Sequence, residues 1–431
     1  MKFEKIVCEK LSETYFKGVH ESGLEVIVIP KKQTTLYSLF ATRYGSVDNE
    51  FKVEGEENFH SVPAGVAHFL EHKLFENSNG EDTFLRFSKL GASCNAFTSN
   101  DVTAYLFTAT ENYYEALHEL VSFVSDPYFT PETVEKEMGI IEQELRMYED
   151  NPHRVLFENM LTCLYRTHPV RISVGGTVES IHEITPDVLY TCYNTFYNPC
   201  NMMLIVCGNV ECDKVAEVVT RALPKREKVK VIKAPISEKR EVNIPYFEKE
   251  FSVSLPLFCI GIKECDLAPD NIMKRELEHN LIHELLFGRG SNLFENLYSK
   301  GLINHKFDAS YHVAKNFSYA VISGESRDPV AVFDEVKKEI GAYRRGEKTI
   351  TDKDFERVVA LTWGMCAQVF NSTTDIGDAF LDYELIGEDI ARLPDVLYSI
   401  SKEDLVKRLE TSYGEECMAL STIVPFKEAK K

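Results

Sequence analysis

The segment AGVAHFLEHKLFE, residues 64–76, places two histidines and a glutamate within five residues. Apolar residues at helical spacing surround them, and the turn-forming run NSNG at residues 77–80 follows, so we expect a helix here. Residues three and four positions apart share a helix face, which groups His68, Glu71 and His72. Two imidazoles one turn apart suit tetrahedral zinc, and the carboxylate between them suits a general base. The alternative is a pair of core histidines on an amphipathic helix.

A third zinc ligand is expected from the helix predicted over residues 131–150, because catalytic zinc usually has three protein ligands. Helical phase places Glu137 and Glu144 within an apolar stripe, and the solvent side holds other charges. Charges in a buried stripe are costly unless they are paired or bound to metal, so these two carboxylates need an explanation. Pairing with an arginine at the margin of the stripe is the alternative. The stripe consists of Val134, Met138, Ile141, Leu145 and Tyr148, and the solvent side of Glu135, Glu142, Arg146 and Glu149.

A second histidine pair occurs in EHNLIHELLF, residues 278–287, where His279 and His283 are four positions apart. No carboxylate stands between them in the position of a general base, and no third ligand is evident nearby. An ordinary surface or core helix is therefore the favoured interpretation.

The composition indicates a globular protein. The chain has 431 residues, 44% of them hydrophobic, and a formal net charge of −20, which argues against a nucleic-acid partner. Its 11 cysteines are odd in number and irregularly spaced, with no CxxC, so we expect reduced thiols. The N-terminal residues lack an apolar leader, and no 18-residue apolar run occurs. We expect a cytoplasmic protein without a membrane span.

The order of apolar segments predicts an α+β fold with two similar α/β sandwich halves, each an antiparallel-type sheet covered by helices. GLEVIVIPKK (23–32) and TTLYSLFATRYGS (34–46) are expected to form neighbouring strands, and residues 93–110 a strand pair. The stretch 223–245 is rich in Lys, Glu and Pro and is predicted to be a linker. It separates a zinc-binding catalytic half, residues 1–222, from a C-terminal half without zinc, residues 246–431.

The N-terminal half resembles the pitrilysin/insulinase family (M16) of zinc peptidases, the inverted zincins. The resemblance rests on HxxEH and on four later stretches in the family's order, and it is nearest to a short bacterial two-gene type. The stretches are GASCNAFTSNDVTAYLF (91–107), EKEMGIIEQELRMYEDNP (135–152), HPVRISVGGTVESI (168–181) and YNPCNMMLIVCGNV (197–210).

This resemblance implies an endopeptidase for short or unfolded peptides, with a role for each matched residue. His68, His72 and Glu144 would bind Zn²⁺, Glu71 would be the general base, and Glu137 would orient the site. Asn95 would contact the scissile peptide, and the strand backbone of Ala96, Phe97 and Thr98 would pair with the substrate. The two halves would enclose a cleft or chamber.

One departure from the family concerns the C-terminal half, which usually supplies an Arg and, seven residues later, a Tyr. In ENLYSKGLINHKF, residues 295–307, Tyr298 stands where the Arg is expected, and His305 or its neighbours stand where the Tyr is expected. In the two-gene type a partner without zinc ligands carries the Arg/Tyr pair. The resemblance therefore implies a heterodimer with a related M16 subunit, and a homodimer is the other possibility. A non-catalytic peptide-binding or scaffold subunit is the alternative function, and a structural zinc protein is disfavoured because no cysteine cluster accompanies the site.

Overall fold

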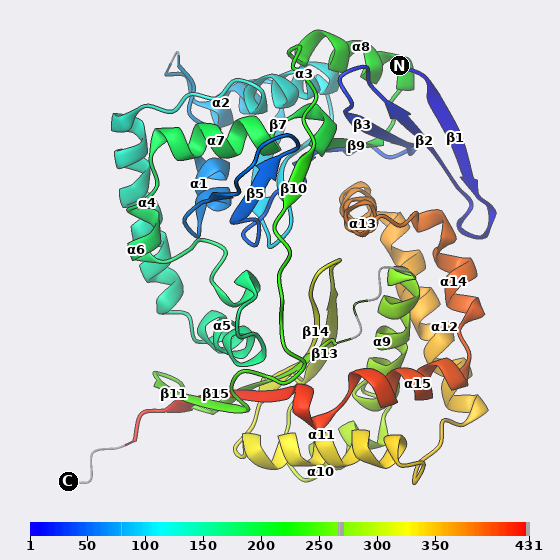
Figure 1. Cartoon of the computed structure of the whole chain (residues 1–431). Coiled ribbons are helices and arrows are strands. Elements are labelled where there is room, and N and C mark those ends of the chain that lie inside the picture. The colour runs from blue at the N-terminus through cyan, green and yellow to red at the C-terminus, as the bar shows by residue number, and fades with distance from the viewer. Residues whose placement is uncertain (79, 266, 268–270, 428–431) are drawn as a thin grey trace. The chain divides into compact units, whose positions relative to one another are not determined.

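The computed structural model describes residues 1–78, 80–265, 267 and 271–427, and the chain divides into two compact units (Figure 1). Both units combine a mixed β-sheet with helices, which confirms the predicted α+β class. Unit 1 contains residues 1–145, 172–235 and 367–391, and unit 2 contains residues 146–171, 236–366 and 392–431.

Unit 1 is built on a seven-stranded sheet in the order β1-β2-β3-β9-β4-β8-β7. Strands β3 and β9 are parallel, and every other neighbouring pair in this sheet is antiparallel. The expected pairing of β3 with β4 is wrong, because β9 lies between them. All three strands are apolar runs at the buried centre of the sheet, and such runs report burial without specifying the partner. The bounds are β1 Phe3–Cys8, β2 Glu13–Val19, β3 Glu25–Pro30, β4 Leu36–Thr42, β7 Ala92–Thr98, β8 Thr103–Ala109 and β9 Met202–Gly208.

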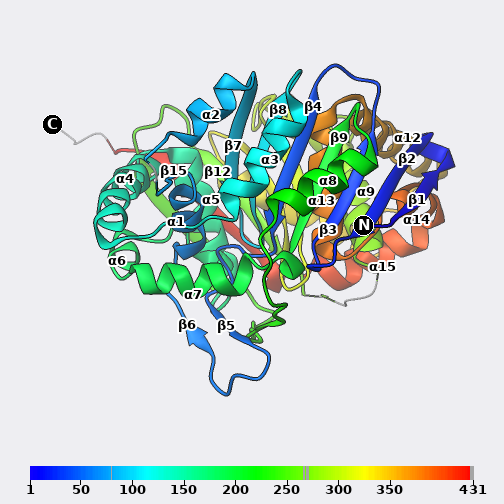
Figure 2. The same ribbon diagram turned by 90° about the horizontal axis from the view of Figure 1, so that it is seen from above.

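Helices cover both faces of this sheet, as successive residues of β4 show. Ser38 hydrogen-bonds Tyr113 at the start of α3 (Tyr113–Val124), with 2.5 Å between the two hydroxyl oxygens. Tyr37 points to the opposite face, where its hydroxyl donates to Asp378 of α13 (Thr373–Ile386) at 2.7 Å. Figure 2 shows α8 (Cys212–Ala222) next to α3, and the two helices contact each other.

Two further helices of unit 1, α1 and α2, lie against the edge formed by β7 and β8. Helix α1 contacts both strands and α7, and α2 contacts β7 and α3. A small sheet in the order β10-β5-β6 completes the unit, and its strand β10 falls within the predicted linker 223–245. The bounds are α1 Val66–Lys73, α2 Thr83–Lys89, α4 Pro131–Glu149, α6 Val178–Ile181, α7 Pro186–Phe196, β5 Glu50–Val53, β6 His60–Ser61 and β10 Val231–Lys233.

Unit 2 has a five-stranded sheet in the order β11-β15-β12-β14-β13, parallel between β11 and β15 and otherwise antiparallel. Helix α5 packs on β12 and β15, where a Cβ at Gly261 would meet the Met160 side chain. Helix α9 packs on β13 and α15. The bounds are α5 Pro152–Leu164, β11 Tyr246–Phe251, β12 Leu257–Lys263, α9 Ile272–Leu286, α10 Asn292–Ser299, β13 Asp308–Val313, β14 Ser318–Glu325, α11 Pro329–Arg344, α12 Asp352–Gln368, α14 Leu393–Ser399, α15 Lys402–Ser412 and β15 Met418–Pro425.

The compact units are discontinuous in the sequence, whereas the predicted halves are continuous. Helix α5 precedes residue 222 and belongs to unit 2, and α13 follows residue 245 and belongs to unit 1. The predicted cleft between the halves stays a prediction. Across the described residues, every helix is too short or too polar to span a membrane.

The packing of α13 on β4 yields a stability prediction at Gly377. A Cβ there would lie 2.5 Å from two ring carbons of Tyr37, which is 1% exposed and held by Asp378. Because the ring is confined, Gly377→Ala is expected to destabilise the protein by about 1–3 kcal/mol through overpacking. Urea unfolding of the variant and the parent protein measures the change.

Gly139 in α4 provides the matched control, because a Cβ there meets no atom within 4 Å. Gly139→Ala is expected to be neutral or to stabilise by up to about 1 kcal/mol, since alanine favours the helix. Equal urea midpoints for the two variants would contradict the proposed confinement of Tyr37.

Candidate metal centre

The position of α1 is fixed by its buried face and by a close contact at its start. Gly65, which precedes the helix, has φ +94°, and a Cβ there would lie 2.4 Å from the carbonyl oxygen of Gly175. Glycine is therefore required both by conformation and by space. Val66, Ala67, Phe69 and Leu70 are buried and anchor the helix. His68, Glu71 and His72 lie on its half-buried face, as their spacing predicts.

The two imidazoles converge on one carboxylate from α4. Nε2 of His72 lies 3.4 Å from Oε2 of Glu144, and Nε2 of His68 lies 3.8 Å from the same oxygen. One ligand atom from each of His68, His72 and Glu144 lies within 4.8 Å of the other two. This is the one group of potential metal ligands found in the described part of the chain. Two imidazoles and one carboxylate leave a fourth position open on a tetrahedral ion, so this donor set fits catalytic zinc.

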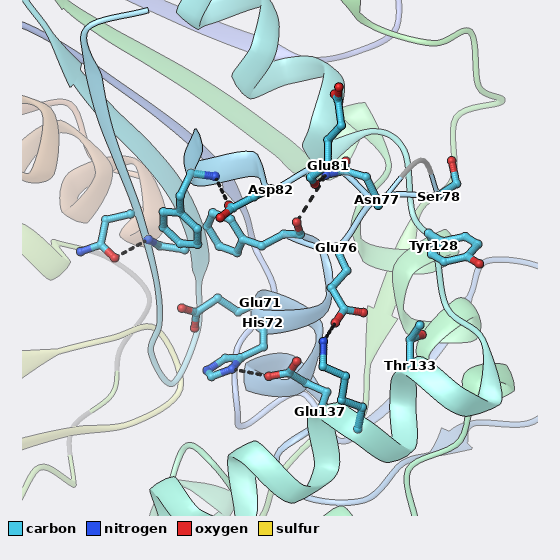
Figure 3. A pocket seen from close by; sticks show the side chains of 16 residues that line it. Glu71, His72, Glu76, Asn77, Ser78, Glu81, Asp82, Tyr128, Thr133 and Glu137 are labelled. Carbon is cyan, nitrogen blue, oxygen red and sulfur yellow. Dashed lines mark hydrogen bonds and ion pairs between the residues drawn. The ribbon is translucent and has the colours of Figure 1, made fainter. Parts of the chain in front are cut away.

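Glu137 contacts the other ring nitrogen of His72, the one that does not face Glu144. Its Oε1 is 2.9 Å from Nδ1 of His72, and the residue is 6% exposed. When Nδ1 donates to Glu137, the lone pair of Nε2 is left for a metal. Burial alone would lower the pKa of His72, but the hydrogen bond and charge of Glu137 outweigh it and raise the pKa. Figure 3 shows this pair beside Glu71.

The prediction that Glu137 and Glu144 lie within the buried stripe of α4 is confirmed. Glu137 is buried with the apolar residues of the stripe, and Glu144 is half-buried. Glu135, Arg146 and Glu149 are exposed as expected, whereas Glu142 is half-buried. Glu137 pairs with His72, and Glu144 pairs with His68 and His72, as the metal alternative expects.

Glu71 is held by a residue that sequence reasoning assigned another role. The Thr98 hydroxyl donates to Oε2 of Glu71 at 2.6 Å. Burial raises the pKa of Glu71, and the Thr98 hydrogen bond opposes that rise. The contact joins positions 27 apart in the sequence. In the sequence, the only signal for this contact is the alternation of residues along β7, which places the Thr98 side chain on the same face of the strand as Ala96.

The segment Asn95–Thr98 lies in β7, which is at the end of the sheet order and pairs with β8 alone in that sheet. An edge strand has unpaired backbone groups that an extended peptide could use. The Asn95 side chain is exposed, and its Oδ1 accepts a hydrogen bond from the Ala96 N–H at 2.9 Å. Its expected contact with substrate stays a prediction.

A cavity of about 770 Å³ opens beside Glu71 and His72 (Figure 3). Phe75 and Phe84 form an apolar wall, their rings stacked with centroids 4.6 Å apart. Glu76 also lines the cavity and pairs with Lys136 at 3.3 Å between Oε1 and Nζ. The cavity therefore combines an aromatic wall with charged groups next to the candidate metal ligands.

The second histidine pair belongs to the core of unit 2, in agreement with the favoured interpretation. His279 is 2% exposed, and its ring nitrogens lie 2.7 Å from Tyr413 Oη and 2.7 Å from Glu264 Oε2. His283 is 4% exposed, and both of its ring nitrogens are buried without a hydrogen-bond partner. Ile282 occupies the place that Glu71 has between the first two histidines.

Comparison with known proteins adds independent support for the family. Residues 60–178 match the model of insulinase (peptidase family M16), and residues 183–361 match the peptidase M16 inactive domain. The chain is 37% identical to the "Uncharacterized zinc protease YmfH" of Bacillus subtilis over 97% of this chain and 98% of that protein.

Solved structures agree with this match. An M16-like peptidase from Alicyclobacillus acidocaldarius has a TM-score of 0.91 and 31% identity, and covers 99% of both chains. Pitrilysin shares the fold with a TM-score of 0.75 and 18% identity, over 100% of this chain and 47% of the pitrilysin chain.

The buried His283 yields a prediction for pH-dependent stability. Burial lowers its pKa from 6.5 to about 3, so below pH 6.5 the unfolded chain binds a proton that the folded chain excludes. Stability is therefore lost as pH falls, by about 2 kcal/mol between pH 7.5 and 5 from this residue. His283→Leu is expected to lose less stability than the parent over that interval. Urea midpoints at pH 7.5 and pH 5 measure the difference, and parallel declines in both proteins would contradict it.

Proposed function

The chain belongs to the insulinase family of peptidases, M16, and on this premise we propose that it is a zinc-dependent endopeptidase for short or unfolded peptides. The observation that carries the proposal is that the histidines and the glutamate of α1 have different partners. His68 and His72 converge on Glu144, whereas Glu71, on the same turn, hydrogen-bonds Thr98. A metal site with a separate, positioned carboxylate beside it suits hydrolysis better than a purely structural role.

In this proposal His68, His72 and Glu144 hold Zn²⁺, the cofactor of the family. When bound, zinc supplies a Lewis acid that polarises a peptide carbonyl and lowers the pKa of a water molecule. Glu71 accepts the proton of the attacking water and later donates it to the leaving amine. Thr98 restricts the Glu71 carboxylate through their hydrogen bond, and Glu137 orients His72. These two contacts position the base and one ligand before substrate binds.

Substrate binding is proposed to occur along β7. The free edge of this strand would pair with an extended peptide from Ala96 to Thr98, and Asn95 would contact the scissile bond. The adjoining cavity, with its Phe75–Phe84 wall, would receive a substrate side chain. A folded substrate could not present such a strand, so short or unfolded peptides are the preferred class.

A partner subunit is part of the proposal because of the Arg/Tyr departure. Tyr298 stands where the Arg is expected, and His305 or its neighbours where the Tyr is expected; Tyr298 and His305 are both exposed. We propose a heterodimer with a related M16 subunit that supplies the Arg and Tyr, with a homodimer as the other arrangement. The same departure is the observation that favours the second candidate function, a subunit that binds peptides without cleaving them.

Substitution of the general base tests the catalytic proposal. Glu71→Gln keeps the size of the side chain but cannot accept a proton, so it is expected to retain zinc and lose at least about 100-fold in peptide cleavage. Zinc content by elemental analysis and cleavage of a mixed set of short peptides measure the two effects. The purified chain is assayed alone and together with a related M16 subunit that contains the Arg/Tyr pair.

The controls are the parent chain before and after treatment with a chelator. Cleavage by the parent that disappears in both the chelated sample and Glu71→Gln would support the proposal. Full activity of Glu71→Gln would contradict the role of the base. A zinc-loaded parent that binds peptides and cleaves none, with or without the partner, would favour the non-catalytic function.

Removal of Glu137 tests its role in orienting His72. Glu137→Ala deprives Nδ1 of His72 of its acceptor and is expected to weaken zinc binding roughly 10–100-fold. Competition with a fluorescent chelator measures the affinity. Glu135→Ala removes an exposed carboxylate from the same helix and should leave zinc affinity unchanged. Equal affinities for the two variants would refute the orienting role.

A further inference from the structure

The thiols of Cys265 and Cys417 lie side by side in unit 2, and both residues are distant in the sequence from the metal motif at residues 68–72. Their sulfur atoms are 3.3 Å apart, although the residues are 152 positions apart in the chain. Cys265 follows the end of β12 and Cys417 immediately precedes β15. These two strands are antiparallel neighbours, with Ile262 opposite Met418, so the sheet itself sets the approach of the two thiols. A disulfide has an S–S bond of about 2.0 Å, so the sulfurs need to approach by about 1.3 Å more.

The two thiols differ in access and in charge environment. Cys265 is half-buried, whereas Cys417 is fully buried. The hydrogen bond with the Cys417 thiol lowers the pKa of Cys265, and the nearby Arg240 and Lys263 cations act in the same direction. By contrast, burial raises the pKa of the half-buried thiols Cys94 and Cys366 to about 11. A more accessible thiol of lowered pKa beside a second, resolving thiol is the arrangement of redox-reactive cysteine pairs.

We propose that Cys265 and Cys417 are a reversible redox site that hydroperoxides oxidise to a disulfide. The Cys265 thiolate attacks one peroxide oxygen, so an S–O bond forms and the O–O bond breaks. With hydrogen peroxide, the leaving hydroxide takes up the proton released by the thiol and becomes water. The Cys417 sulfur then attacks the sulfenic sulfur of Cys265, and the S–S bond forms as a second water leaves. In sum, two thiols and one peroxide give one disulfide and two waters.

Disulfide formation would also change how the neighbouring residues 240–242 are held. The Cys265 thiol donates to the backbone carbonyl of Arg240 at 3.4 Å, and the Arg240 guanidinium pairs with Glu416 at 2.9 Å. The Val242 N–H donates to the Glu416 carbonyl oxygen, also at 2.9 Å. Oxidation removes the Cys265 S–H and with it the hydrogen bond to Arg240, whereas the contacts of Glu416 with Arg240 and Val242 do not depend on a thiol. The site is independent of the proposed peptidase chemistry.

The test is oxidation of the full, reduced chain with one molar equivalent of hydrogen peroxide. Free thiols are then alkylated, and the protein is digested without reduction and analysed by mass spectrometry. We expect a peptide that links Cys265 to Cys417, the loss of two free thiols per chain, and recovery of both after treatment with dithiothreitol. This measurement uses the parent protein and does not depend on a variant that folds.

Three variants sharpen the result. Cys265→Ser should abolish the link, and Cys417→Ser should leave Cys265 as a sulfenic acid that dimedone traps. Cys366→Ser, the matched half-buried control, should still form the link. The proposal would be overturned if Cys265 and Cys417 are both recovered as free thiols while other cysteines are oxidised. It would also be overturned if Cys265 forms its disulfide mainly with a different cysteine.

Discussion

The hydrogen bond between His72 and Glu137 joins two helices whose contacting residues are 65 positions apart, and the geometry of the candidate centre depends on it. It fixes which nitrogen of His72 faces Glu144, and it gives the buried Glu137 carboxylate a partner. The helices themselves are held by apolar packing, with Phe69 and Leu70 of α1 and Ile141 and Leu145 of α4 all buried. The polar contact therefore sets orientation within a framework that hydrophobic burial supplies.

Three carboxylates share this small region, and their surroundings give them different chemistry. Glu137 is buried against an imidazole, Glu144 is shared between two imidazoles, and Glu71 contacts a neutral hydroxyl. A cation between His68, His72 and Glu144 would offset the concentration of negative charge that these groups create. Because Glu71 lies outside that group, its carboxylate stays available for proton transfer in the proposed mechanism. Identical side chains are thus distinguished by their neighbours and not by their type.

The sequence predicted the local features of the fold and site well, because they depend on short-range periodicity. The α1 face with His68, Glu71 and His72 and the burial of Glu137 follow from helical spacing alone. The insertion of β9 between β3 and β4 and the hydrogen bond from Thr98 to Glu71 depend on contacts between distant segments. Periodicity states which side of an element is buried but not what covers it, so these features needed the folded structure.

The exchange of helices between the two units has a consequence for synthesis on the ribosome. Helix α13 covers the face of β4 that contains Tyr37, with Gly377 against the Tyr37 ring. This face of unit 1 therefore stays uncovered until the ribosome has released the chain as far as residue 386. Unit 2, in turn, takes α5 from the first half of the chain, which must wait for β12 and β15. Neither unit can therefore be completed as an N-terminal domain that folds first. A fragment cut within residues 223–245 would leave an apolar sheet face open in each piece, with aggregation as the expected result.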